Sequence, residues 1–522
     1  MPTCPLLADR WAAVKADLLD ELSDALDALA ETAFSADFAG QRVLESGVWS
    51  RLLQTGRVLL GQLLSLACLA QTARHPAFLH ERTPLRVDAS YRTSLQSTLG
   101  PIVVFLCAFR DPAGKTLTPA RGVVMPRRAS VRATELLVEW SSRIGAELPF
   151  RAGQQALSFF THDAVHIEDT TLQRQAQLAG RLVSRQDCFR SKEDIEKLLR
   201  NRATRDSSTG RPLVYLSSDA HALRRYVDDS CHAPWKMING IRMWCVDRRS
   251  GATLHLGGEY TWGEAEALEG VFKGLQSDGF VPADSRFGDV EAQFVLVLDG
   301  ADWLRDRWKP HLPEDTVYIL DFFHVQQNVA AVVAAVYGQG SKLARSRLAR
   351  VFRILAGRRR PPKASRSARK GQSKKRRRRR RRRAIRLSAH QGGAGMELVD
   401  WLADTLKADA DAAGELDALD KLLAYLERNA DRLDFPSYQR RNYQIGSGAM
   451  ESFHRQASQL RLKRPGARWL PENALGILRL RLMTLAGRWE HFWAAPGRAL
   501  GLHERKTHCT PRKEDMTAQP QL

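Results

Sequence analysis

Three acidic residues follow segments that would bring their carboxylates together. Asp219 follows the apolar run PLVYLSS, Asp299 follows FVLVL, and Glu451 lies on a helix-like segment just after Gly-Ser-Gly at residues 446–448. Two aspartates at strand ends and a third carboxylate on a packed helix can hold two Mg²⁺ or Mn²⁺ ions about 3.5 to 4 Å apart. Such a pair of ions stabilises both the attacking and the leaving oxygen of phosphoryl transfer. The three acids together therefore predict metal-dependent phosphoryl transfer, although a single aspartate after a strand is more often a helix cap or a turn residue.

An alternation of strands and helices from residue 212 onward would position these acids. Buried strands are expected to end at Asp219, at Asp299 and near Asp321. Between the first two, IRMWCVDRRSGATLHLGGEY predicts a hairpin that turns at residues 249–251, and GEAEALEGVFKGLQSDG predicts a helix. Open α/β sheets bind ligands at the carboxyl ends of their strands. We therefore expect an α/β catalytic domain, residues 212–324, with its acids at one end of the sheet.

The preceding region, residues 1–205, predicts mainly helices. Apolar residues recur at three- and four-residue steps in the first part, and a hairpin is expected at residues 100–120. The last two of three short helices before residue 184 could form a helix-turn-helix, with Arg174 and Arg181 on the exposed face of a recognition helix. The alternative is an ordinary helical subdomain with a solvated polar face.

The chain is strongly basic, with 80 Lys plus Arg against 58 Asp plus Glu and a net charge of +22. This balance argues against an acidic small-molecule enzyme and favours a polyanionic partner, most often nucleic acid. Residues 358–386 hold 18 of the basic residues and no acid, so most of the net charge lies in this segment. The segment is expected to be a solvated or disordered insertion that contacts phosphate backbones without reading bases. Alternatives for its arginine run, residues 376–383, are codon expansion and a nuclear-localisation signal.

Length, cysteines and hydropathy set the broad class of protein. With 522 residues, of which 43% are apolar, the chain predicts two to four globular domains. Its seven cysteines are scattered and include no Cys-x-x-Cys pair, so neither a disulfide framework nor a Cys-rich zinc site is expected. The longest apolar stretches, near residues 58–70 and 329–337, are shorter than the roughly 20 residues that span a membrane, and no signal-peptide pattern is present. We expect a soluble protein of a reducing, intracellular compartment.

Beyond residue 324 the pattern predicts a helical insertion over residues 325–438, interrupted by the arginine-rich segment. Residues 439–495 would complete the catalytic domain with the Glu451 helix, and residues 496–522 would form a tail. Basic residues that flank Glu451 are expected to contact DNA phosphates, with a solvated helix face as the alternative for each. They are Arg440, Arg441, Arg455, Arg461, Lys463, Arg464 and Arg468.

Three short segments carry a family resemblance. VLDGADWL, ILDFFHV and GSGAMES together resemble signatures of DDE transposases of bacterial insertion sequences, in the ISKra-type group related to Mutator-like elements. The resemblance extends from about residue 214 to residue 493. It implies a ribonuclease H-like mixed sheet with an all-helical insertion, in which Asp219, Asp299 and Glu451 are the catalytic and metal-binding acids.

The same resemblance assigns Asp321 and His324 to a D-x-x-H element. His324 would then orient the scissile phosphate or the flanking strand, and a structural histidine bonded to Asp321 is the alternative. Family members often carry a Cys-x-x-Cys zinc element at the N-terminal hairpin, where only Cys107 remains in this sequence. Mg²⁺ or Mn²⁺ is therefore the expected cofactor, and zinc is not expected.

The activity that the resemblance implies is that of a DNA transposase. Metal-dependent cleavage at the element ends would be followed by transfer of the freed 3′-hydroxyl into target DNA. Double-stranded DNA would be the partner, residues 1–205 would bind the element ends, and a homo-oligomer would form on DNA. The expected location is the bacterial cytoplasm, with the nucleoid and without a membrane. Two hypotheses remain beside it: a catalytically silent, domesticated sequence-specific DNA-binding protein, and a structure-selective nuclease of the same fold.

Overall fold

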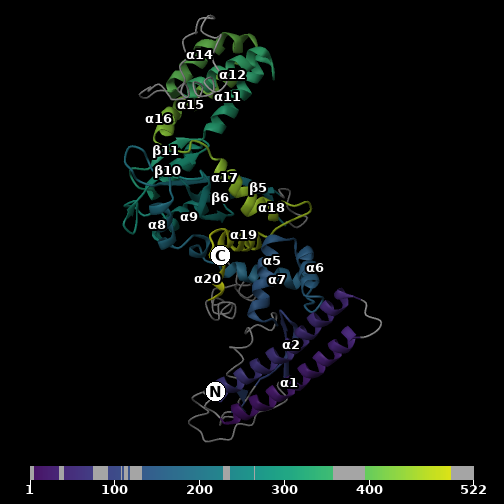
Figure 1. Cartoon of the computed structure of the whole chain (residues 1–522). Coiled ribbons are helices and arrows are strands. Elements are labelled where there is room, and N and C mark those ends of the chain that lie inside the picture. Colours follow the sequence, from purple (N-terminus) through teal and green to yellow (C-terminus); the bar gives the residue numbers. More distant parts are fainter. Residues whose placement is uncertain are drawn as a thin grey trace, which may run out of the picture. The chain divides into compact units, whose positions relative to one another are not determined.

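The structure, a computed structural model, combines a mainly helical N-terminal region with an α/β region built on a mixed sheet (Figure 1). The predicted α/β class and the helical N-terminal region are confirmed. The structure describes residues 5–34, 40–73, 92–106, 109–110, 116–117, 132–226, 235–263, 265–356 and 394–494. The arginine-rich segment 358–386, the tail 496–522 and Cys107 lie outside these residues, as does the polar turn of the hairpin predicted at residues 100–120.

The chain divides into two compact units. The first comprises Met1–Ser184, Glu472–Thr484 and Arg488–Leu522, and the second comprises Arg185–Pro471 with Leu485–Gly487. The two units divide after Ser184, which is earlier in the chain than the boundary that we expected between residues 205 and 212. A helix from the C-terminal part of the chain completes the first unit, which no local sequence pattern indicated.

Two long helices, α1 (Pro5–Phe34) and α2 (Gln41–Ala73), pack side by side in the first unit (Figure 1). The hairpin β1 (Arg92–Ser97)–β2 (Gly100–Phe105) packs on α2, where the Phe105 N–H donates to the Ser65 hydroxyl oxygen at 3.0 Å. By length and composition alone, the Gln41–Ala70 part of α2 would reach across a membrane, which differs from our expectation for the apolar stretches. A single helix of this kind is weak support for a membrane span, because packed helices of other proteins meet the same criteria.

A short antiparallel pair, β3 (Phe109–Arg110) and β4 (Thr116–Leu117), agrees with the hairpin predicted at residues 100–120. The first unit also contains a helical cluster of α5 (Glu135–Glu147), α6 (Phe150–Phe160), α7 (Asp169–Leu182), α19 (Pro471–Leu485) and α20 (Trp489–Trp493). Within it, α7 and α19 approach so closely that a Cβ atom on Gly180 would collide with the backbone carbonyl of Gly476. Glycine at position 180 therefore permits the contact between the two helices.

We expect the substitution Gly180→Ala to destabilise the first unit by about 1 to 3 kcal/mol, because the added methyl group meets backbone atoms that have no room to move. The matched control is Gly270→Ala in helix α9 (Ala265–Ser277) of the second unit, where a Cβ would have no neighbour within 4 Å. The control is expected to be neutral or to stabilise by roughly 0.5 to 1 kcal/mol. Urea unfolding of both variants measures the difference, and equal midpoints would contradict the proposed steric role of Gly180.

The second unit contains a five-stranded sheet in the order β11-β10-β5-β6-β7. Its strands are β5 (Leu213–Arg224), β6 (Trp235–Val246), β7 (Thr253–Thr261), β10 (Gln293–Leu298) and β11 (Val317–Leu320). β5, β10 and β11 are parallel, whereas β6 and β7 run antiparallel to their neighbours. The hairpin predicted to turn at residues 249–251 is confirmed as β6–β7.

Helices α9 (Ala265–Ser277) and α10 (Asp302–Trp308) cover one face of the sheet. Trp308 stacks on Phe272 with 3.7 Å between ring centroids, and its indole N–H donates to the Ser218 hydroxyl at 2.9 Å. Ser218 therefore points to this face, and its neighbour Asp219 points to the opposite one because side chains alternate along a strand.

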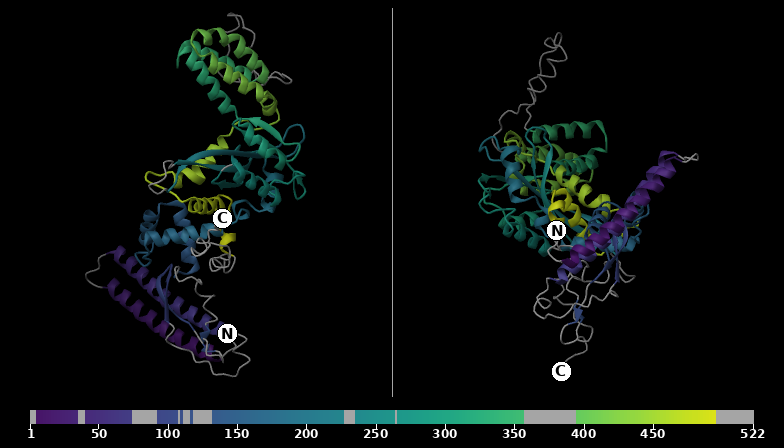
Figure 2. Two further views of the ribbon diagram at one scale, coloured as in Figure 1. Left: turned by 180° about the vertical axis from the view of Figure 1, so that it is seen from behind. Right: turned by 60° about the horizontal axis from the view of Figure 1, so that its bottom comes forward.

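The opposite face packs against the predicted helical insertion. Its helices are α11 (Phe322–Tyr337), α12 (Lys342–Leu355), α14 (Ala394–Ala412) and α15 (Leu416–Arg428), which gather next to β10 and β11 (Figures 1 and 2). They form one continuous apolar core with residues of the sheet, including Tyr215, Val297, Ile319, Val329, Leu402 and Leu426. The insertion is thus part of the same hydrophobic core as the strands that carry the acids.

Candidate active site

Asp219 lies within β5. The prediction that its strand ends there is wrong, because β5 continues to Arg224. The first half of β5, Leu213–Leu216, pairs with β10, and the second half stays paired with β6. Asp219 therefore sits where the sheet loses one neighbouring strand and keeps the other, which opens the sheet beside its side chain.

Asp219 and Asp299 lie equally far beyond the paired stretch of two neighbouring parallel strands. The register aligns Leu216 with Leu296 as its last pair, and three further residues lead to Asp219 within β5 and to Asp299 just after the end of β10. The charges of both carboxylates raise the pKa of His324, so both lie within electrostatic reach of that ring. That the two carboxylates share a metal ion stays a prediction.

A tight turn fixes the backbone at Asp299. Gly300 has a φ of +100°, and a Cβ there would lie 2.7 Å from the Tyr425 hydroxyl oxygen. That hydroxyl donates to the backbone carbonyl of Asp299 at 2.8 Å, and the Ala301 N–H donates to Asp299 Oδ1 at 3.1 Å. The helical insertion, through α15, therefore holds the turn that presents the exposed Asp299 side chain.

Asp321 caps the N-terminus of α11 and is completely buried. Its Oδ1 accepts from the N–H groups of Phe323 at 3.0 Å and Ser447 at 3.2 Å, and its Oδ2 accepts from the Ser447 hydroxyl at 2.6 Å. Burial alone would raise the pKa of this carboxyl, but these hydrogen bonds and one from His324 lower it. Asp321 therefore joins the β11–α11 junction to the loop before Glu451.

His324 is bonded to Asp321, with 2.5 Å between Nδ1 and Oδ2. This hydrogen bond raises the pKa of His324 against the opposing effect of burial, and the charges of Asp321, Asp299 and Asp219 raise it further. The structural bond that we considered as an alternative is thus present. The imidazole, 37% exposed, also lies within electrostatic reach of both candidate metal ligands.

Glu451 belongs to a continuous helical segment beside β5 and β6 (Figure 1). The segment comprises α17 (Gly448–Phe453), a π-helical turn (His454–Gln459) and α18 (Leu460–Leu462). π-Helical turns inside α-helices occur frequently at functional sites. The segment is held down by Arg242, which donates to the Ala449 carbonyl oxygen.

Glu451 shares a helix face with two residues that contact the other acids. Ser447, four positions before it, bonds to Asp321, and His454, three positions after it, has Nε2 at 3.5 Å from Asp219 Oδ2. Residues three and four positions apart lie on the same side of a helix. Glu451, with an exposed side chain, thus lies along the chain between two residues that contact Asp321 and Asp219.

The carboxylate oxygens of these residues are the ligands that Mg²⁺ and Mn²⁺ prefer. Burial would raise the pKa of Asp219, but its interaction with His454, the Ala220 N–H and the charge of His324 lower it, so the carboxylate is ionised at neutral pH. Within the described parts of the chain, no three His, Cys, Asp or Glu side chains converge closely enough to hold an ion as they stand. The fit is therefore one of donor chemistry, because Asp219, Asp299 and Glu451 all offer carboxylate oxygens.

The predicted phosphate-binding residues fall into different environments. Arg455, Lys463, Arg464 and Arg468 are exposed on or just after the helical segment that carries Glu451. Arg440 is partly buried. These positions place four exposed cations along the chain within 20 residues of the third acid.

Arg441 and Arg461 have partners inside the protein. Arg441 donates to the buried carboxylate of Asp206 at 2.6 Å and lies over the Tyr443 ring at 4.8 Å. Arg461 is 3% exposed and lies over the Trp469 ring at 5.1 Å. Their guanidinium groups therefore contribute to packing of the second unit.

The two helices that we predicted for a helix-turn-helix are present as α6 and α7. Arg174 is exposed on α7, whereas Arg181 donates to the Asn473 amide oxygen on α19 at 2.7 Å. The contact between α7 and α19 at Gly180 covers part of the face that a recognition helix would present. Both arginines are exposed, and Arg181 differs in being held by its hydrogen bond to α19.

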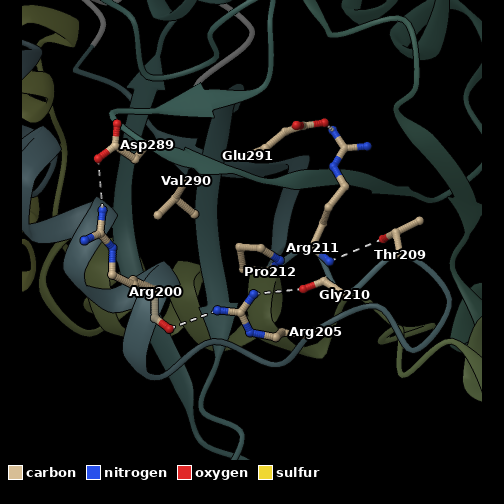
Figure 3. Close-up of a pocket in the computed structure, with 9 residues that line it drawn as sticks. All are labelled: Arg200, Arg205, Thr209, Gly210, Arg211, Pro212, Asp289, Val290 and Glu291. Carbon is tan, nitrogen blue, oxygen red and sulfur yellow. Dashed lines mark hydrogen bonds and ion pairs between the residues drawn. The ribbon is translucent and has the colours of Figure 1, made fainter.

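A pocket of about 420 Å³ lies at the other end of β5, beside the short hairpin at residues 286–291 (Figure 3). Three arginines contribute to its lining. Arg200 and Arg211 each form an ion pair with a carboxylate, and Arg205 donates to two backbone carbonyls. Because this pocket lies at the amino end of the parallel strands and its charges are largely compensated, the carboxylate cluster is the better candidate site.

Sequence reasoning missed the side chains that surround Asp219. His454 is 3% exposed, and its Nδ1 lies 3.0 Å from the Tyr260 hydroxyl. His221 packs edge-on against the His454 ring, 4.5 Å between centroids, and burial and the charges of His454 and Lys463 lower its pKa to about 3. His454 follows Glu451 by three positions, which is the spacing of residues on one helix face. This spacing could have identified His454 from the sequence.

The second unit is thus an α/β domain with a mixed five-stranded sheet, in which Asp219 lies on β5, Asp299 follows β10 and Glu451 lies on a helix beside β5 and β6. Compared with models of protein families and with curated proteins, the chain matches none of them. The assignment of a function therefore rests on the geometry of this site.

Proposed function

We propose that this protein is a DDE-type DNA transposase that cleaves DNA at the ends of its element and joins the freed 3′-hydroxyl to target DNA. The single observation that carries the proposal is the placement of Asp219 and Asp299, each three residues beyond the last register pair of the parallel strands β5 and β10. The position of Glu451 along the chain between Ser447 and His454 supports the third acid. The order β11-β10-β5-β6-β7, in which β6 alone of these five strands runs opposite to the others, supports a ribonuclease H-like core.

In this proposal Asp219 and Asp299 hold divalent metal ions together with Glu451, and the ions supply charge neutralisation at the phosphodiester when bound. His324, fixed by Asp321, points its second ring nitrogen away from that carboxylate and is available to orient the scissile phosphate or the flanking strand. The Asp321–Ser447 bonds keep the Glu451 helix close to the strands. The protein's own residues thus position the DNA and the ions, and none of them forms a covalent intermediate.

The test uses the full-length protein with Mg²⁺, a supercoiled target plasmid and linear DNA that carries the sequences flanking its coding region. Cleavage with joining of the 3′ ends to the plasmid is the expected result. Cleavage without joining would favour a structure-selective nuclease instead. Tight end recognition with neither reaction would favour a catalytically silent DNA-binding protein.

Replacing the exposed cations Arg455, Lys463 and Arg464 by alanine should weaken DNA binding at every sequence and reduce its salt dependence. Each lost phosphate contact lowers the slope of log affinity against log salt concentration by about 0.9. Arg211→Ala, which removes an arginine at the other end of β5, is the matched control and should leave the slope unchanged. Fluorescence anisotropy at several salt concentrations measures both, and an unaltered slope for the triple variant would assign these residues to a solvated surface.

A further inference from the structure

His454 occupies a buried position between Asp219 and a second polar group. Its Nδ1 lies 3.0 Å from the Tyr260 hydroxyl, and its Nε2 lies 3.5 Å from Asp219 Oδ2. Within the described residues, the buried Nε2 makes no hydrogen bond of normal geometry. Asp219 Oδ2 therefore lies beside this nitrogen at a distance slightly longer than a normal hydrogen bond.

Gly240 leaves room beside the sheet for the His454 ring. Gly240 pairs with Asp219 on β5 and with Tyr260 on β7, so the three residues lie in one row on the same face. A Cβ atom on Gly240 would lie 2.7 Å from His454 Cε1 and 2.7 Å from a Tyr260 ring carbon. The missing side chain thus creates the space in which the imidazole reaches both Tyr260 and Asp219.

The two contacts favour one hydrogen-bonding arrangement of the imidazole. A carboxylate only accepts hydrogen bonds, so an N–H at Nε2 is favoured opposite Asp219. Nδ1 then accepts from the Tyr260 O–H, and this donor fixes the tautomer. The edge of His221, 4.5 Å away between ring centroids, and the ring of Phe453 limit rotation of the imidazole.

We propose that Tyr260 and His454 form a positioning pair that orients the Asp219 carboxylate for divalent metal binding, with Nε2–H directed at Oδ2. The inference rests on the proposed function, because it takes Asp219 as a metal ligand. His454 lies beside Oδ2 of Asp219, whereas Oδ1 accepts from the Ala220 N–H at 2.7 Å. Partners that orient a metal ligand from the side remote from the ion typically change metal affinity or activity by 10- to 100-fold.

The test compares Mn²⁺ binding by isothermal titration calorimetry in the full-length protein and two variants at position 454. His454→Leu fills the space without a donor and should weaken Mn²⁺ binding by about 10- to 100-fold. His454→Gln, whose amide can donate to Asp219 and accept from Tyr260, should restore most of that loss. Gly240→Ala, which displaces the ring, should resemble His454→Leu.

The control is His255→Leu. His255 stacks on Phe453 with 5.6 Å between ring centroids, so this variant disturbs packing under the same helix without removing a group that faces Asp219. Its Mn²⁺ affinity should stay within about twofold of the original protein, whatever its thermal stability.

Each remaining outcome decides a different point. If the original protein does not bind Mn²⁺, the proposed function is overturned, and the inference that rests on it is overturned as well. If it binds Mn²⁺ and His454→Leu binds equally well, the positioning role is overturned. The same holds if His454→Gln is as weak as His454→Leu, or if His255→Leu loses the same affinity, because the effect would then be one of packing.

Discussion

Asp299→Asn should reduce Mg²⁺-dependent DNA cleavage and joining by at least about 10³-fold while DNA binding is retained. Held metal ions contribute several kcal/mol to stabilising the charge of phosphoryl transfer, and each 1.36 kcal/mol corresponds to a factor of ten in rate. Asn keeps the shape of the side chain but removes the charge that attracts the ion. Because Asp299 is exposed, the thermal midpoint should hardly change.

Asp306→Asn is the matched control. Asp306 is a nearby exposed aspartate on α10, with a side chain 62% exposed that pairs with Arg305. The two variants remove the same charge from the same domain, so only a specific role of Asp299 separates their rates. Single-turnover cleavage measures the rates and anisotropy measures DNA affinity. Rates within threefold of each other would refute the assignment of Asp299 as a metal ligand and with it the proposed reaction.

Local sequence patterns predicted the strands and the hairpin of the catalytic domain well. The apolar runs before Asp299 and Asp321 are strands β10 and β11, and the polar turn at residues 249–251 joins β6 to β7. These features depend on side-chain alternation and turn residues within about ten positions. The same patterns could not predict that β5 continues past Asp219, because its extension is stabilised by pairing with β6, whose length no local pattern of β5 encodes.

The polar groups that surround the three acids were less predictable than the acids themselves. Glu451 is 152 positions from Asp299 in the printed sequence, and its placement depends on the bond from Ser447 to Asp321. His454 contributes only because Gly240, on another strand, lacks a side chain. Arg441 was expected to bind phosphate, yet it pairs with Asp206, a residue that no motif singled out. Contacts between residues far apart in sequence thus decided which polar groups surround the acids.

Asp206→Asn should destabilise the second unit by about 3 to 5 kcal/mol, the usual cost of removing one partner of a buried ion pair. The carboxylate is 1% exposed and accepts from Arg441 at 2.6 Å and from the Tyr443 hydroxyl at 2.8 Å. It also accepts from the N–H of Ser208 at 2.8 Å and from its hydroxyl at 2.7 Å. The substitution leaves the Arg441 charge without its acid. The control, Asp417→Asn, breaks an exposed pair with Lys421 and should cost at most about 0.5 kcal/mol.

The same variant gives a pH test with a defined sign. Burial would raise the pKa of Asp206, but its hydrogen bonds outweigh burial and hold the pKa well below the ordinary value of about 3.9. In acid, the unfolded chain therefore takes up a proton that the folded protein does not. The stabilisation by Asp206 is complete above about pH 5 and is lost as the pH falls toward the folded pKa. Urea unfolding between pH 6 and pH 3 should show the gap between the original protein and Asp206→Asn narrowing in acid. A gap that stays constant would mean that the charge of Asp206 does not stabilise the fold, and that Arg441 is held by packing on Tyr443 alone.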